Sequence, residues 1–340
     1  MPRPLRVAVL QGGRSSEHEV SLNSAHSVAE GLDPARYEVR TIEIGRDGKW
    51  QLQRAPQAEL GERAMTKLPV PANGKIEPLD GVDVVFPVLH GPFGEDGTVQ
   101  GFLELAGVAY VGAGVTASAL CMDKDLFKSV MRDKGVPVTR SVTLLARHRD
   151  RVENPFGFPV VVKPARLGSS VGISIVKATE DLAAAVDLAL EHDEKILLEE
   201  HVAGVEVECS VLGNEEPIAS IPGEIVPLAS DWYDYEAKYA EDGMELVVPP
   251  RISEEAIQRV QELAVAAFVA ADCEGMARVD FFVRESGEVL VNELNTIPGF
   301  TATSVYAKLF EASGIPYVEL LDRLVQLALE RRDRRERLKY

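Results

Sequence analysis

The chain has 340 residues, enough for two or three domains that each bury a core. Its 36 basic and 54 acidic side chains give a net charge of −18, which disfavours nucleic acids and anionic membranes as partners. An anionic substrate would therefore need local lysines. Three widely spaced cysteines, Cys121, Cys209 and Cys273, are typical of buried thiols in a reducing compartment. Without a signal peptide, and with no apolar stretch longer than 263–271, we expect a cytoplasmic protein.

The first third of the chain alternates strand and helix patterns, which predicts a parallel sheet covered by helices. The predicted strands cover residues 5–10, 39–44, 82–89 and 109–111. One helix is predicted from a capping box at Ser16 and Glu19 to Gly31, and another over 98–106. The segment 54–78 is polar and contains prolines, so we expect a surface excursion there.

Residues 112–117 (GAGVTA) loosely match the dinucleotide-binding fingerprint GxGxxG/A. That fingerprint also requires a following strand that ends in an acidic residue. Here a helix over 124–134 intervenes, and the next strand, 139–145, ends in Leu-Ala-Arg. The pattern therefore favours a tight turn at a helix N-terminus over an NAD site.

A loop of small residues, 164–172, connects two predicted strands in the middle of the chain, 158–163 and 173–176. Such a loop can close over phosphates, although the same pattern suits an ordinary hairpin tip. Lys163 ends the first strand beside this loop, and a lysine there is suited to bind a phosphate. The sequence therefore predicts a phosphate-binding hairpin, followed by a helix over 181–191 and by strands over 195–199 and 204–211.

A long segment, 225–248, has no clear periodicity, and its centre, 230–239, is rich in tyrosine and charge. Long irregular segments in compact domains are often lids, and the aromatic residues argue against disorder, so we predict a lid. Two amphipathic helices are predicted in the remainder of the chain, over 253–270 with Ser253 as cap, and over 317–332.

Two apolar runs, 279–283 and 289–294, predict a β-hairpin. With Ser286-Gly287 as a two-residue turn, Asp280 lies opposite Glu293, and Arg278 opposite Asn295. These four side chains then share one face of the sheet. Carboxylate and amide oxygens suit Mg²⁺, although a buried Arg–Asp salt bridge beside a solvated Glu would explain the same residues. Backbone N–H groups of the following loop, 295–299, could meet an anion.

Motifs along nearly the whole chain resemble those of D-alanine–D-alanine ligases of the ATP-grasp superfamily. They are, in order, GGRSSEHEVSLNS, LHGPFGEDGTVQG, GAGVTASALCMDK, VVKPARLGSSVGIS, YDYEAKY, ARVDFF and NELNTIPGFT. The resemblance implies an α/β ATP-grasp fold with an N-terminal open parallel-sheet domain. It implies three parts, 1–121, 122–212 and 213–340, with ATP between the second and third and the D-alanines between the first and third.

The resemblance also implies roles for individual residues. Implied ATP contacts are Lys124, Lys163, Ser169, Ser170, Glu199, Glu200, Val202, Glu206 and Lys238. Implied D-alanine contacts are Glu17, His90, Lys238, Arg278, Gly299 and Ser304. Implied ligands of two Mg²⁺ or Mn²⁺ ions are Asp280, Glu293 and Asn295, with Glu293 bridging both ions. The implied catalytic groups are Arg278 with the Gly299 amide, which stabilise an oxyanion, and Glu17, Ser169 and Tyr239, which close the site.

The implied activity is ATP-dependent ligation of two D-alanines through a D-alanyl phosphate, for peptidoglycan precursor synthesis, by a homodimer. A relative that accepts D-lactate or D-serine would keep the same ATP residues, and the lid pattern at 236–239 (EAKY) favours D-alanine. A non-catalytic nucleotide-binding regulator is the other alternative. Intact Asp280, Glu293 and Asn295 argue against it.

Overall fold

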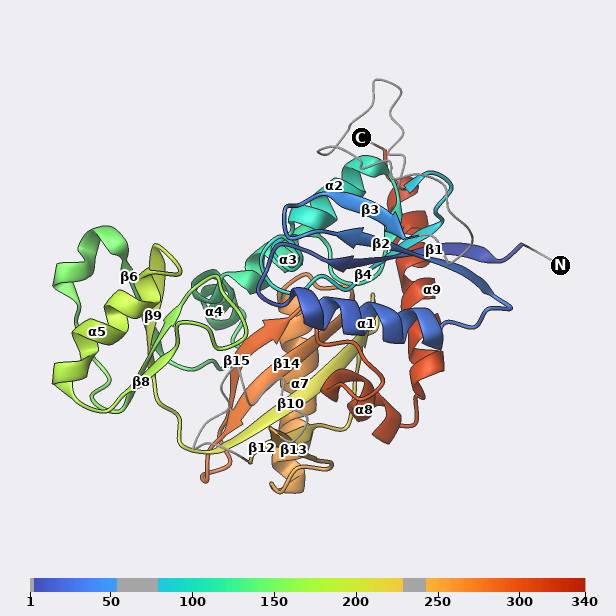
Figure 1. The fold of residues 1–340 in the computed structure, drawn as a ribbon. Helices are drawn as coiled ribbons and strands as arrows, with labels where there is room; N and C mark the ends of the chain where they lie inside the picture. The colour runs from blue at the N-terminus through green and yellow to red at the C-terminus, as the bar shows by residue number, and fades with distance from the viewer. Residues whose placement is uncertain (1–2, 54–78, 229–242, 340) are drawn as a thin grey trace.

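A computed structural model describes residues 3–53, 79–228 and 243–339 (Figure 1). The predicted excursion at 54–78 and the centre of the predicted lid, 230–239, lie outside the described residues. Three sheets organise the rest, and no described helix is long and apolar enough to cross a membrane.

The N-terminal sheet has five strands in the order β3-β2-β1-β4-β5, all parallel except the edge strand β3. Its strands are β1 (Leu5–Gly12), β2 (Tyr37–Ile44), β3 (Trp50–Gln53), β4 (Val84–Pro87) and β5 (Ala109–Tyr110). Residues Val7 to Leu10 of β1 are all fully buried, as expected for a strand covered on both faces. The predicted alternating β/α unit is therefore confirmed.

Helices α1 (His18–Gly31), α2 (Thr98–Ala106) and α3 (Val115–Met122) follow these strands. The predicted capping box is wrong: α1 begins at His18 without any side-chain cap, and Ser16 precedes the N-cap residue, Glu17. The carboxylate of Glu17 is engaged elsewhere, by Ser169. The 112–117 motif forms a turn into α3, and the Gly112 carbonyl there accepts a hydrogen bond from the buried Arg331.

The central sheet has four antiparallel strands in the order β6-β9-β7-β8. It contains β6 (Ser141–Leu145), β7 (Val160–Pro164), β8 (Ser174–Val176) and β9 (Lys195–Glu200). Helix α4 (Lys124–Asp133) leads into it, a 3₁₀ segment η2 (Ala146–Arg151) follows β6, and α5 (Thr179–Leu190) packs on β7 and β8. This unit forms one end of the molecule (Figure 1).

The C-terminal sheet is antiparallel, in the order β13-β12-β10-β14-β15, with β11 beside β10. It contains β10 (Val205–Gly213), β11 (Ile218–Ala219), β12 (Gly223–Pro227), β13 (Met244–Val247), β14 (Gly275–Val283) and β15 (Val289–Asn295). Helix α7 (Glu254–Ala270) packs on β10, β14 and β15, and its predicted cap is confirmed because Ser253 accepts from Ala256 N at 3.2 Å.

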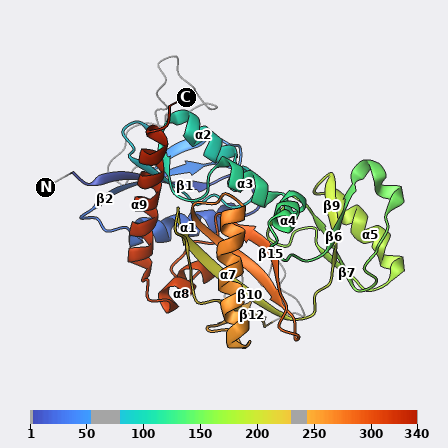
Figure 2. The ribbon, with the colours of Figure 1, turned by 180° about the vertical axis from the view of Figure 1, so that it is seen from behind.

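The last two helices return the chain to the N-terminal sheet. Helix α8 (Val305–Ala312) leads into α9 (Tyr317–Glu336), which runs beside the N-terminal sheet (Figures 1 and 2). Phe300 and Phe310 pack in one buried cluster with Val84 and Phe86 of β4. One core thus joins both ends of the chain.

The β14–β15 hairpin has the predicted pairs Arg278–Asn295 and Asp280–Glu293, but not the predicted turn. Arg284 N donates to the Glu288 carbonyl at 2.9 Å and closes the hairpin, so three residues, not two, form the turn. Gly287 at φ +84° supplies the left-handed residue of such a loop. A bulge at Asn292 adds one residue to β15 and restores the predicted pairing.

Candidate functional site

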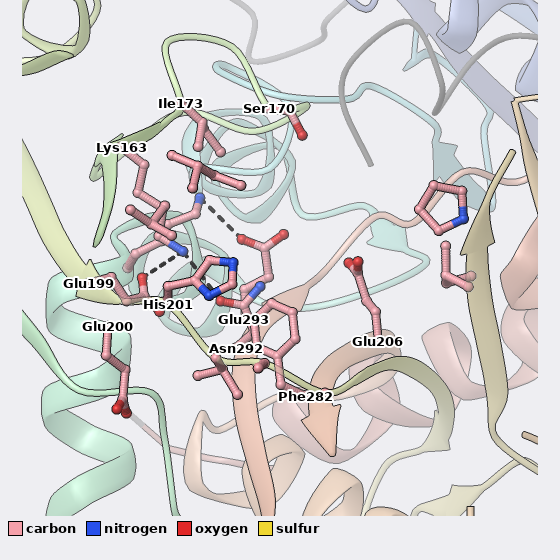
Figure 3. A pocket seen from close by; sticks show the side chains of 18 of the residues that line it. Lys163, Ser170, Ile173, Glu199, Glu200, His201, Glu206, Phe282, Asn292 and Glu293 are labelled. Carbon is pink, nitrogen blue, oxygen red and sulfur yellow. Dashed lines mark hydrogen bonds and ion pairs between the residues drawn. The ribbon is translucent and has the colours of Figure 1, made fainter. Parts of the chain in front are cut away.

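A cavity of about 460 Å³ lies between the central and C-terminal sheets (Figure 3). It is lined by apolar side chains, among them Val161, Ile173, Ile175 and Phe282, and by lysines and glutamates. Of the residues predicted to bind ATP, eight line it, namely Lys124, Lys163, Ser169, Ser170, Glu199, Glu200, Val202 and Glu206. An apolar slot with charge at one side suits a nucleotide.

Two lysines predicted from the sequence meet at one side of this cavity. Lys163, at the end of β7, is 5% exposed and lies 2.7 Å from Glu199 and 3.3 Å from the Asn292 oxygen. Lys124, the first residue of α4, donates to the Leu167 carbonyl at 2.8 Å and lies 3.4 Å from Glu293. The structure therefore brings together the predicted phosphate lysines and one predicted metal ligand.

A third lysine, Lys128, belongs to the same cluster, although the sequence did not predict it as a site residue. It is fully buried, 2.6 Å from Glu199, and it hydrogen-bonds Thr139. Burial lowers the pKa of Lys128 to about 8. Burial alone would raise the pKa of Glu199, but the charges of Lys128 and Lys163 outweigh it and lower that pKa to about 2. A lysine on the same helical face as Phe127 and Met131 was the available signal.

The segment that connects the two sheets, residues 200–204, also lines the cavity. The Glu200 carboxylate turns away from the cavity (Figure 3) and binds Arg140 at 2.8 Å and Arg284 at 3.1 Å. Its side chain is therefore a salt-bridge partner, and only its backbone remains for a ligand. Val202 is 9% exposed, and Glu206 projects from β10 toward the cavity (Figure 3).

The small-residue loop between β7 and β8 reaches the N-terminal segment. Ser169 and Ser170 both have left-handed backbones, with φ of 54° and 58°. The Ser169 hydroxyl donates to Glu17 at 2.5 Å, across 152 residues of sequence. The structure thus brings Glu17 and Ser169 into contact, whereas their predicted partner Tyr239 lies outside the described residues, as does Lys238.

We call the face of the C-terminal sheet that carries Arg278, Asp280, Glu293 and Asn295 the reaction face. Arg278 donates to both Asp280 oxygens at 2.7 Å, and the Asn295 amide nitrogen donates to Asp280 at 2.9 Å. The Arg–Asp salt bridge of the alternative interpretation is thus present, but Glu293 faces Lys124 rather than solvent. No group of three His, Cys, Asp or Glu residues forms a metal centre in the described parts of the chain.

His90 and Glu95 connect the N-terminal sheet to the loop after β15. His90 is 4% exposed, and its ring nitrogens lie 3.0 Å from the Ile297 carbonyl and 3.2 Å from the Ser24 hydroxyl. Burial lowers the pKa of His90. Glu95, missed in the sequence, accepts from Gly91 N at 2.8 Å and Ile297 N at 3.1 Å, and burial, with the nearby charge of Glu17, raises its pKa to about 8.

The loop after β15 contains the last two predicted substrate residues, Gly299 and Ser304. Ser304 precedes α8 and accepts from Thr301 N at 2.8 Å. A Cβ at Gly299 would lie 3.5 Å from the Ser304 hydroxyl, so the two positions are neighbours. Their loop thus lies between the reaction face and α8.

Two antiparallel sheets that enclose a nucleotide-sized cavity, in which buried lysines contact an acidic hairpin, define an ATP-grasp protein. Two family models match the chain: the N-terminus of D-ala D-ala ligase over residues 6–113, and its C-terminus over 130–326. The chain belongs to the D-alanine–D-alanine ligase family.

Individual relatives are similar in sequence to this chain over nearly its full length. The chain is 45% identical to the D-alanine–D-alanine ligase of Natranaerobius thermophilus, covering 98% of both chains. It is 44% identical to D-alanine–D-alanine ligase A of Escherichia coli K12, covering 96% of both.

Solved structures are similar over the same extent. The VanG D-Ala:D-Ser ligase of Enterococcus faecalis has a TM-score of 0.83 at 38% identity, covering 96% of this chain and 100% of that one. The D-alanine–D-alanine ligase of Coxiella burnetii has a TM-score of 0.82 at 36% identity, covering 98% and 97%. The Bacillus anthracis ligase complexed with ATP has a TM-score of 0.76 at 28% identity, covering 97% and 99%.

Proposed function

We propose that this chain uses ATP to join two D-alanines into D-alanyl-D-alanine, a peptidoglycan precursor, through a D-alanyl phosphate. Family membership over the full length supports the activity. The observation that carries the ATP site is the cavity between the two antiparallel sheets, with Lys163 and Lys124 at one side. In a chain with a net charge of −18, these are the local cations that an anionic nucleotide needs.

For ATP, we propose that the apolar slot holds adenine, with the backbone from Glu199 to Val202 beside it and Glu206 at the ribose. Lys124 and Lys163 would neutralise the phosphates, with Ser169 and Ser170 closing over them. Apolar walls beside a charged end support this orientation. We assign Glu200 a backbone contact only, because its carboxylate binds Arg140 and Arg284.

For metal, we propose that Asp280, Glu293 and Asn295 hold two Mg²⁺ or Mn²⁺ ions, with Glu293 touching both. The donor set fits, since it offers hard oxygen atoms only. Asn295 also donates its amide nitrogen to Asp280, which leaves its oxygen as the atom for a cation. Such ions would spread the negative charge that develops during phosphoryl transfer.

The chain's own residues then perform two steps. Glu17 binds the ammonium of the first D-alanine near His90. The carboxylate of that D-alanine attacks the γ-phosphate of ATP and ADP leaves, with Lys163 and Arg278 stabilising the charge. The amine of the second D-alanine, bound by Ser304 and Lys238 through its carboxylate, then attacks the D-alanyl phosphate. Arg278 and the Gly299 amide hold the oxyanion, and phosphate leaves. Because an acyl phosphate hydrolyses readily, Tyr239, Ser169 and Glu17 close the site against water.

We further propose three structural parts, with the second boundary moved from 212 to about 203, because β10 pairs with β12 and β14 of the C-terminal sheet. A homodimer and a cytoplasmic location also stay proposals. The use of ATP and three buried free cysteines support that location.

The acceptor is tested by competition, since one similar structure is a D-Ala:D-Ser ligase. Purified chain receives ATP, Mg²⁺ and labelled D-alanine with excess D-serine or D-lactate at neutral pH, and the products are separated. With D-lactate we expect D-alanyl-D-alanine and negligible ester, because a neutral Tyr239 does not repel an ammonium acceptor. D-serine carries the same ammonium, so the experiment with D-serine tests the acceptor assignment independently of Tyr239. Mixed product comparable to dipeptide would overturn the acceptor assignment but leave the ATP site intact.

A further inference from the structure

Glu208 is a buried carboxylate that none of the roles above uses, and it lies beside Arg278. It is 2% exposed on β10 and directly opposite Asp280 of β14. Because opposed residues of paired strands point to the same side, Glu208 belongs to the reaction face. Its Oε2 lies 3.0 Å from Arg278 Nε. Burying a carboxylate costs free energy unless the charge is paired, and Arg278 provides the opposite charge here.

Arg278 is held between two carboxylates on neighbouring strands. Its Nε–H and one Nη2 hydrogen are both donated to Asp280, at 2.7 Å each. In this state the Nε–H is directed at Asp280, and Glu208 lies beside it as a second counter-charge. From 3.0 Å it is in position to accept that hydrogen whenever Asp280 releases it.

Under the proposed function, the Asp280 carboxylate also binds metal, and this would weaken its hydrogen bond with the Arg278 Nε–H. A carboxylate that gives its oxygens to a divalent cation is a weaker acceptor for a guanidinium. We propose that Glu208 is a positioning residue that takes over the Arg278 Nε–H when Asp280 binds metal. The guanidinium then stays aimed at the oxyanion in both states. This inference rests on the proposed function.

Kinetics test it first, with Glu208→Gln, Glu208→Asp and the control Glu274→Gln. The control removes a carboxylate that lies just before β14, pairs with Arg334 of α9 and does not line the cavity. We expect Glu208→Gln to lower kcat about tenfold or more, since a misaimed oxyanion donor is costly, with KM for ATP within about twofold. Glu208→Asp keeps the charge and should recover part of kcat, and Glu274→Gln should match the unmodified chain.

A second measurement does not depend on turnover: the NMR signal of Arg278 Nε–H, recorded without ligand and with Mg²⁺ and ADP. We expect Glu208→Gln to match the unmodified chain without ligand, where Asp280 accepts the hydrogen, and to lose protection from exchange when Mg²⁺ and ADP are bound.

Three results would overturn the inference: equal loss of protection in both states, which indicates a plain structural ion pair; no loss in either state; or a normal kcat with a raised Mg²⁺ requirement, which makes Glu208 a ligand. A failure of the proposed function would look different. The unmodified chain would then release no phosphate with D-alanine, while the NMR comparison could still be made.

Discussion

At the scale of single residues, the cluster of Lys128, Glu199 and Lys163 explains how an acidic protein can attract phosphate. Two buried lysines share one carboxylate, at 2.6 and 2.7 Å, so the cluster keeps a net positive charge. Burial alone would lower the pKa of Lys163, but Glu199 and Glu293 outweigh it and raise that pKa, so Lys163 stays charged at neutral pH. Glu199 therefore acts through the lysines that it holds.

Glu199 also gives the fold a pH dependence of definite sign. Its pKa is lowered from 4.5 to about 2 on folding, so its stabilisation is complete above pH 4.5 and is lost as the pH falls toward 2. The shift corresponds to about 3 kcal/mol at most. In urea unfolding at about pH 6 and about pH 3, we expect Glu199→Gln to lose less stability on acidification than the unmodified chain. The exposed Glu285→Gln is the control, and an equal loss in all three proteins would contradict this pKa.

Glu293 is the residue on which the metal assignment depends. Glu293→Gln removes charge from both proposed ions, and we expect kcat to fall at least about a hundredfold, which is roughly 2.8 kcal/mol. Turnover is measured over a Mg²⁺ titration, with Glu285→Gln of the same hairpin as control. Near-normal turnover at saturating Mg²⁺ would rule out a two-metal site.

At the scale of elements, the β14–β15 hairpin shows which structural features a sequence pattern can predict and which it cannot. The pairs Asp280–Glu293 and Arg278–Asn295 could be predicted because alternation and the turn region limit the register. The course of the chain through the turn could not be predicted. The turn is one residue longer than predicted, and the bulge at Asn292 compensates for the extra residue. Nothing in the polar sequence around Gly287 distinguishes a two-residue turn from a three-residue turn.

An insertion beside Asn292 tests the register that the bulge sets. With one alanine inserted between Asn292 and Glu293, Glu293 would move to the opposite face and the buried Leu294 would be displaced, because a one-residue slip reverses every side chain. We expect Mg²⁺-dependent turnover to disappear and the melting temperature to fall. Inserting one glycine after Ser286 is the matched control, since it only lengthens the exposed turn, and most of the activity should remain. If both insertions behave alike, the register of β15 has no role in aiming Glu293.

The missed residues have a common physical cause. Lys128, Glu95 and Glu208 act through tertiary contacts that strand and helix patterns do not encode, such as the contact of Glu95 with Ile297, 202 residues away. Only Lys128 left a local signal, its place on the buried face of α4. The capping box of Ser16 and Glu19 failed for a local reason: α1 begins at His18, so Ser16 lies one residue before the N-cap position.

At the scale of the whole molecule, α9 holds the N-terminal sheet against the rest. Arg331 is 3% exposed, donates to the carbonyls of Gly112 and Tyr110, and stacks 4.2 Å from the Tyr110 ring. Arg331→Met would leave two buried carbonyls without these donors, so we expect the free energy of unfolding to fall by about 2–4 kcal/mol. Chemical unfolding measures this, with the exposed Arg337→Met as control. Unchanged stability would mean that Arg331 does not hold α9 in place.

The central claim is that the cavity activates a D-alanine carboxylate as an acyl phosphate. The most direct measurement supplies ATP, Mg²⁺ and D-alanine labelled with ¹⁸O in its carboxylate, and analyses the dipeptide and phosphate by mass spectrometry. We expect one phosphate per dipeptide, with one ¹⁸O transferred from the carboxylate, because that oxygen attacks the γ-phosphate. Unlabelled phosphate, ¹⁸O in AMP, or no dipeptide would contradict the account.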